Sequence, residues 1–116
     1  MDAIKKIKEI YTLEELKEIA DHGCQSGVCH EHIYYGNTVQ FYDEYETEIL
    51  DELVLNYGYD LLNDLFKDAD ANLTCYKNSV TWAFIELVAF DAVAEAENEA
   101  LLEADKIAEY MTANIY

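Results

Sequence analysis

The chain of 116 residues contains no arginine, and seven lysines are set against 25 aspartates and glutamates, which gives a net charge of −18. Proteins that bind phosphate groups or nucleic acids rely on Arg and Lys side chains, so direct binding of nucleic acid is not expected. An acidic surface also repels anionic membranes and attracts basic protein surfaces. Because a net charge of about 2–8 suffices to keep a small domain soluble, this chain is more acidic than solubility requires.

Targeting signals and membrane spans are also lacking. The first ten residues alternate Lys and Ile and are too polar for the core of a signal peptide, and no segment is apolar enough to cross a bilayer. Three cysteines, an odd number without a secretory signal, predict reduced thiols. We therefore expect a cytoplasmic protein without a membrane partner.

The hydrophobic fraction of 52% predicts one folded domain over residues 1–116, in spite of the charge. Its organising element is the stretch 79–110, which has no Gly or Pro and repeats apolar residues at helical spacing. The first half of this stretch is apolar almost all round, which predicts a helix buried on several sides. The fold class that we predict is all-α, with four to five helices.

Shorter helices are expected before this stretch. Residues 2–10 form the first helix, and the second begins at a capping box in which Thr12 and Glu15 bond each other's backbone, and ends before Gly23.

Residues 24–36 then form a loop. A third helix follows an N-cap at Asn37-Thr38 and ends at Gly58. The alternative for its start is a β-hairpin across Gly36-Asn37 that pairs residues 32–35 with residues 38–42. Asp60 is expected to cap a short fourth helix, and residues 70–77 are expected to form a loop.

The acidic residues are unevenly distributed, because residues 1–37 carry a net charge of −3 and residues 38–116 carry −15. Carboxylates four residues apart on a helix repel one another, so their regular spacing suggests a partner that prefers rows of negative charge. Duplex DNA is such a row, and proteins that hold it present Lys and Arg. A solvated acidic face without a partner is the simpler explanation. The residues expected to bind a partner are Asp43, Glu44, Glu48, Asp51 and Glu52 on the third helix, and Asp91, Glu95, Glu99 and Glu103 on the long helix.

The main alternative hypothesis is that the chain binds a metal ion. His22, Cys24, Cys29 and His32 could supply four zinc ligands in a small adaptor protein. However, all four come from one irregular segment without a second ligand pair, so we expect no metal and no cofactor. We also find no nucleophile elbow and no phosphate-binding glycine loop, and therefore expect no enzyme activity.

Part of the first half of the chain resembles a motif in small, mostly uncharacterised proteins of tailed bacteriophages. The residues that carry the resemblance are Gly27-Val28, Ile33-Tyr34-Tyr35, Thr38, Phe41-Tyr42-Asp43 and Glu48-Ile49. In size and charge, the chain is similar to phage-encoded anti-restriction and anti-CRISPR inhibitors, several of which imitate DNA. The resemblance implies a non-enzymatic inhibitor whose partner is the basic DNA-binding surface of a host defence protein, such as a CRISPR effector or a restriction nuclease. The oligomeric state is left open, and a dimer is among the states allowed.

Overall fold

The computed structural model describes the backbone of residues 2–23, 35–70 and 72–115, and the side chains of these residues apart from 35, 36 and 100–115. The described residues form the helices α1 (Asp2–Ile10), α2 (Leu13–His22), α4 (Tyr35–Tyr57), α5 (Tyr59–Asp68) and α6 (Leu73–Ile115). No strand occurs within these ranges, which confirms the all-α prediction. The hairpin alternative is wrong, because residues 38–42 are helical.

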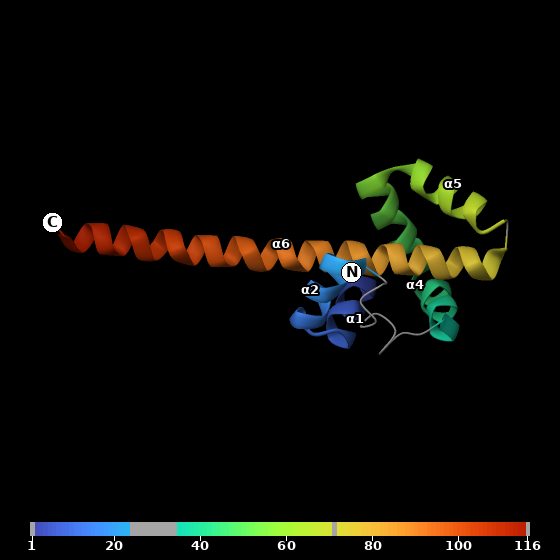
Figure 1. Ribbon diagram of the computed structural model, residues 1–116, viewed down its shortest axis with the longest axis horizontal. Coiled ribbons are helices and arrows are strands. Elements are labelled where there is room, and N and C mark those ends of the chain that lie inside the picture. Colours follow the sequence, from blue (N-terminus) through green and yellow to red (C-terminus); the bar gives the residue numbers. More distant parts are fainter. Residues whose placement is uncertain (1, 24–34, 71, 116) are drawn as a thin grey trace.

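Helix α6 forms the long axis of the molecule, which measures 67 × 29 × 24 Å. Its 43 residues correspond to a helix about 65 Å long. Helices α1 and α2 lie on one side of α6, and α4 crosses it, so that the end of α4 and all of α5 lie on the other side (Figure 1). The C-terminal part of α6 extends beyond the other helices (Figure 1).

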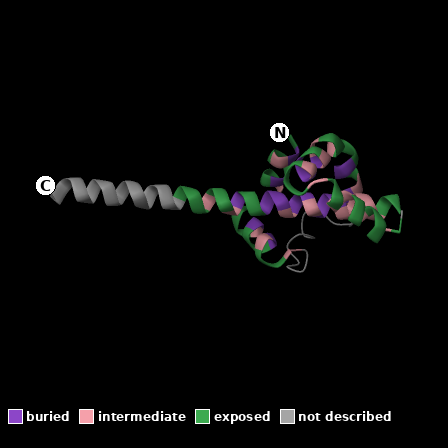
Figure 2. Cartoon of the chain, turned by 90° about the horizontal axis from the view of Figure 1, so that it is seen from above, coloured by how far each residue is buried: buried purple, intermediate pink, exposed green. Residues whose placement is uncertain are grey.

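The hydrophobic core surrounds the first half of α6, as the sequence predicts. Helices α1, α2, α4 and α5 all pack against α6, and Figure 2 shows its buried residues concentrated where they do so. Among the α6 side chains that the structure describes, five have no exposed surface: Val80, Thr81, Phe84, Ile85 and Ala89. They meet fully or almost fully buried side chains of the surrounding helices, among them Ile7, Ile19, Ile49 and Leu53, and of Tyr11 between α1 and α2.

Local sequence signals account for both ends of α2 and for the end of α4. The backbone N–H of Glu15 donates to Thr12 Oγ1 at 3.2 Å, and the backbone N–H of Thr12 donates to Glu15 Oε1 at 3.0 Å. The predicted capping box is therefore confirmed. Gly23 follows α2 with a φ of 61°, and Gly58 follows α4 with a φ of 78°, a region that favours glycine. Both predicted helix ends are confirmed.

The start of α4 differs from the prediction. The helix begins at Tyr35, and Thr38 lies inside it with no exposed surface. Its hydroxyl donates to Asn78 Oδ1 on α6 at 2.6 Å, and its carbonyl accepts from the hydroxyl of Thr81 at 3.1 Å. Thr38 therefore joins α4 to α6 and does not cap a helix.

The starts of helices α5 and α6 also differ from the predicted ones. Gly58 precedes α5 without a side-chain cap, and Asp60 lies in the first turn. Helix α6 begins at Leu73, within the stretch expected to be a loop. The reason is that Asn72 caps it: the backbone N–H of Cys75 donates to Asn72 Oδ1 at 3.0 Å.

Candidate functional site

Two helices place carboxylates around one open hollow of about 610 Å³, which we call the acidic hollow. Asp2 enters it from the start of α1, and the other residues come from the first half of α4. Two of these, Asp43 and Glu44, precede Tyr45, whose φ of −120° and ψ of 24° interrupt the helix. The residues that line the hollow are Asp2, Asp43, Glu44, Tyr45, Glu46, Thr47 and Glu48.

Glu48 has a structural role in this hollow. Its Oε2 accepts from the backbone N–H of Ala3 at 2.8 Å and from that of Ile4 at 3.2 Å. These N–H groups belong to the first turn of α1 and have no partner within a helix, and the positive end of the helix dipole favours a carboxylate there. Glu48 therefore fixes α1 onto α4 and brings Asp2 into the hollow.

Asp43 is paired with a lysine of α6. Lys77 Nζ lies 2.6 Å from Asp43 Oδ1 and 5.5 Å from the centre of the Tyr42 ring. The Lys77 side chain is only 20% exposed, so this pair is better shielded from water than an ordinary surface pair. The negative charge open to a partner is therefore concentrated on Asp2, Glu44 and Glu46, which are exposed.

Two tyrosines beside the hollow experience its negative field. Burial raises the pKa of Tyr42 to about 12, and Glu46 adds to the effect because its carboxylate repels a phenolate and accepts from the Tyr42 hydroxyl at 3.5 Å. The pKa of Tyr45 is also raised, first by desolvation and then by Glu44. Both phenols stay protonated at neutral pH and can donate hydrogen bonds.

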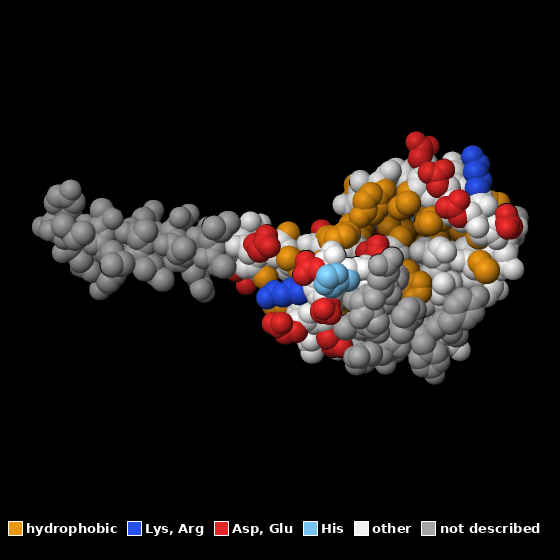
Figure 3. All heavy atoms as spheres, viewed as in Figure 1, with side chains coloured by type: hydrophobic (Ala, Val, Ile, Leu, Met, Phe, Trp, Pro, Cys, Tyr) orange, Lys and Arg blue, Asp and Glu red, His pale blue; other side chains and the backbone are white. Residues whose placement is uncertain are grey.

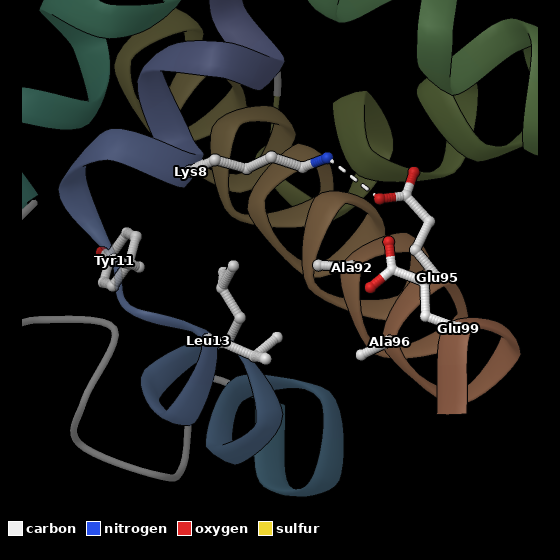
Figure 4. Close-up of a pocket in the computed structure, with 8 residues that line it drawn as sticks. Lys8, Tyr11, Leu13, Ala92, Glu95, Ala96 and Glu99 are labelled. Atoms are coloured by element: carbon white, nitrogen blue, oxygen red, sulfur yellow. Dashed lines mark hydrogen bonds and ion pairs between the residues drawn. The ribbon is translucent and has the colours of Figure 1, made fainter. Parts of the chain in front are cut away.

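A second group of carboxylates lies along α6, where Asp91, Glu95 and Glu99 are exposed. Lys8 Nζ of α1 lies 3.4 Å from Glu95 Oε2, and both side chains are well exposed. Figure 4 shows Lys8 extending to Glu95, with the carboxylate of Glu99 pointing the same way. Glu95 and Glu99 line a hollow of about 270 Å³ together with residues of α1 and α2. The helix continues past Glu103, whose side chain is outside the described residues.

The remaining two predicted residues lie elsewhere. Asp51 is exposed, but it lines a different, largely apolar hollow between α4 and α5. Glu52 was predicted to bind a partner, but it lines that hollow too and is only 9% exposed, so it does not belong to an exposed acidic face. The acidic residues of α4 therefore do not form one continuous exposed row.

Sequence reasoning missed Asp2 and Glu46 as members of the acidic hollow. Glu46 lies between two residues that were predicted, and the interruption at Tyr45 changes which side chains share a face. Asp2 is more than 40 residues in the sequence from the α4 residues that line the hollow, and the bonds of Glu48 to α1 place it there. The spacing of residues within one helix cannot predict such a contact between distant segments.

Metal ligands do not converge in the part of the chain that the structure describes, where no group of three His, Cys, Asp or Glu side chains could hold an ion. Of the candidate zinc ligands, His22 lies exposed in α2, whereas Cys24, Cys29 and His32 are outside the described residues. Within the described ranges, no helix combines the length and the apolar character needed to cross a membrane.

Comparison with known proteins gives one match. No curated protein and no solved structure matches the chain. A family model described as a domain of unknown function, DUF7222, matches residues 3–98. The match runs from α1 into α6 and covers the acidic hollow apart from Asp2, as well as Asp91 and Glu95. The chain therefore belongs to the DUF7222 family.

Proposed function

We propose that this protein is a non-enzymatic inhibitor that binds the basic surface of a DNA-binding protein and excludes DNA from it. In line with the resemblance to phage proteins, its target would be a host defence protein, a CRISPR effector or a restriction nuclease, in the bacterial cytoplasm. The observation that carries the proposal is the acidic hollow, where five carboxylates from α1 and α4 line one opening and no lysine is among the described lining residues. The net charge of −18 gives the same preference for a basic partner.

Rigidity supports the proposal, because a mimic of DNA must hold its charges in place before it binds. Both acidic groups lie on helices that pack against each other around the core. Helix α1 connects them, since Asp2 at its start lines the acidic hollow and Lys8 near its end reaches Glu95. Because the helices that carry these charges are already packed in place, their backbone need not be ordered when a partner binds.

The density of charge on α6 is lower than that of DNA. Carboxylates four residues apart on a helix recur about every 6 Å, whereas one DNA strand presents a phosphate about every 3.4 Å of axis. A single row of Asp91, Glu95 and Glu99 therefore imitates about half the charge of one strand. The acidic hollow has to supply the rest, so both groups are expected to contribute to binding.

The lysines at the edges of these groups do not prevent binding. Lys8 and Glu95 form an exposed pair, and such pairs contribute about 0–1 kcal/mol to stability. Arg or Lys side chains of a partner can displace Lys8 at little cost. Asp43 is held more firmly by Lys77 and is not expected to be a main contact.

Capture from a bacterial lysate tests the proposal. The immobilised protein is incubated at low salt with a nuclease-treated lysate, and the proteins that elute as the salt concentration rises are identified. We expect DNA-binding proteins, released when duplex DNA is added. Retained proteins that added DNA does not displace would contradict the proposal.

A further inference from the structure

An apolar groove lies between the second half of α4 and the start of α5. It has a volume of about 560 Å³ and is lined by Leu50, Val54, Leu55, Tyr59 and Leu62, together with Asp51 and Glu52. Two of these side chains are largely open to water, because Leu55 is 79% exposed and Tyr59 is 72% exposed. Figure 3 shows hydrophobic side chains gathered over α4 and α5, with acidic side chains bordering them.

Exposed apolar side chains such as these favour the binding of a partner. Exposed apolar surface is removed from water when a partner binds, and contiguous patches with a polar rim are typical of interaction sites. Tyrosine and leucine around a concave surface offer a pocket for an apolar side chain of the partner, and the Tyr59 hydroxyl can stay hydrated at the edge. The groove is separate from the acidic hollow, because none of the described residues lines both.

The charges around the groove indicate what covers it. The exposed Asp51 lines it together with the largely buried Glu52, and no lysine is among the described residues that line it. Glu48 of the acidic hollow precedes Asp51 on α4 by three residues, about 4.5 Å of helix rise. A second copy of the chain would bring another net charge of −18 to this surface, so like-charge repulsion opposes self-association.

We propose that the groove between α4 and α5 binds an amphipathic helix of a partner protein, with leucine- or phenylalanine-type side chains in the groove and Lys or Arg on its flanks. The apolar face supplies affinity, and the basic flanks meet the exposed Asp51 and the neighbouring acidic hollow. This inference goes beyond the inhibition of DNA binding, because it rests on the apolar lining and holds for any partner of this chemistry.

A synthetic peptide tests it. The probe is a fluorescently labelled 14-residue helical peptide with Leu on one face and Lys elsewhere, and its dissociation constant is measured by anisotropy at moderate salt. Two control peptides replace every Leu by Ser or every Lys by Glu, and we expect each replacement to weaken binding by at least tenfold. Equal binding of the Leu and Ser peptides would mean attraction by charge alone and would overturn the proposal.

Variants of the protein locate the site. Leu55→Ser and Tyr59→Ser should each weaken binding of the Leu/Lys peptide roughly 10- to 100-fold, as expected for the loss of a buried apolar contact. Leu73→Ser is the matched control, because Leu73 is 57% exposed but lies outside the groove, and its binding should stay within twofold of the wild type. Unchanged binding by Leu55→Ser and Tyr59→Ser would overturn the assignment.

Three further measurements separate the remaining outcomes. In NMR spectra of the wild-type protein, the peptide should shift amide signals of residues 50–62, and shifts confined to residues 43–48 would contradict the proposal. Glu44→Gln with Glu46→Gln should leave the difference between the Leu and Ser peptides intact, so this test can succeed even if the proposed inhibition fails. If the wild-type protein sediments as a dimer that Leu55→Ser dissociates, a second copy occupies the groove and the proposal is wrong.

Discussion

At the scale of single residues, the α4 carboxylates that line the acidic hollow fall into two kinds. Glu48 bonds two backbone N–H groups of α1, and Asp43 is paired with Lys77. Glu44 and Glu46 instead present exposed charge to the acidic hollow. Since neighbouring like charges repel, neutralising an exposed carboxylate should stabilise the fold slightly, whereas neutralising Glu48 should destabilise it.

Glu48→Gln tests this difference. Gln keeps an acceptor oxygen for the N–H groups of Ala3 and Ile4 but loses the charge that favours the helix dipole, so we expect a loss of about 0.5–1 kcal/mol in the free energy of unfolding. Glu44→Gln is the control on the same helix and should be neutral or stabilising. Urea denaturation of both variants gives the comparison, and equal effects of the two changes would disprove the structural role of Glu48.

Tyr42 gives a prediction about alkaline pH. Its pKa is raised to about 12 in the folded protein, chiefly by burial and then by Glu46, whereas an unfolded tyrosine titrates near 10. The folded state therefore holds the proton more tightly, so the stabilisation is fully present below pH 10 and is lost as the pH rises towards 12. Two pKa units correspond to at most about 3 kcal/mol.

Phenylalanine at this position removes the titrating group. Between pH 9 and pH 11.5, Tyr42→Phe should lose less stability than the wild type, as measured by urea denaturation at each pH. Tyr59→Phe, at an exposed position, is the control and should follow the wild type. A Tyr42→Phe curve parallel to that of the wild type would contradict the raised pKa.

At the scale of helices, the parts that follow from local chemistry were predictable from the sequence. Helix α1, the capping box at Thr12 and the glycines that end α2 and α4 depend on neighbouring residues only. Where α4 and α6 begin was not predicted correctly from neighbouring residues. Thr38 was expected to cap α4, but its hydroxyl bonds Asn78 on another helix.

The prediction for Asn72 is wrong in the opposite direction, because a residue expected in a loop caps a helix. Asn72 lies among Asp and Asn residues typical of a loop, yet its side chain caps α6. Both misassignments arise because Ser, Thr, Asn and Asp serve caps, loops and contacts between helices equally well. The burial of a long helix depends on the summed apolar content of many residues, which is why that prediction was confirmed.

The bond between α4 and α6 can be tested at Thr38. Valine has nearly the same shape but no hydroxyl, so Thr38→Val removes the bond to Asn78 and should cost about 1–2 kcal/mol of unfolding free energy. Thr47→Val, at an exposed position on α4, is the control and should change stability by less than about 0.5 kcal/mol. Thermal denaturation compares the two, and similar melting temperatures would mean that the bond contributes little.

At the scale of the whole molecule, the net charge should make stability depend on salt. Repulsion among carboxylates in residues 38–116, which carry a net charge of −15, opposes folding. Salt screens it over a Debye length of about 10 Å at 0.1 M. We expect the melting temperature to rise between 10 mM and 300 mM NaCl, and more steeply for the wild type than for a variant with three fewer carboxylates. A melting temperature independent of salt would show that the charges are too far apart to matter.

The candidate site was predictable only in part. The number of acidic residues and the exposure of Asp43, Glu44, Glu95 and Glu99 follow from composition and helical spacing. How carboxylates group into hollows depends on contacts between distant segments, such as that of Glu48 with α1, and on the interruption at Tyr45. For the same reason the sequence did not separate Glu52, which is buried, from its exposed neighbours.

Displacement of DNA from a captured target tests the proposed inhibition most directly. Fluorescently labelled duplex DNA is bound to the target, and anisotropy follows its release as the protein is added. The hollow variant combines Asp2→Asn, Glu44→Gln and Glu46→Gln, and the α6 variant combines Glu95→Gln, Glu99→Gln and Glu103→Gln.

The control variant combines Asp64→Asn, Asp68→Asn and Asp70→Asn, which removes the same three charges from exposed positions in and after α5. We expect the wild-type and control proteins to displace DNA, less effectively as salt rises, and the hollow and α6 variants to need at least tenfold higher concentrations. If all four proteins displace DNA equally well, or if DNA and protein occupy the target together, the acidic surface is not a mimic of DNA.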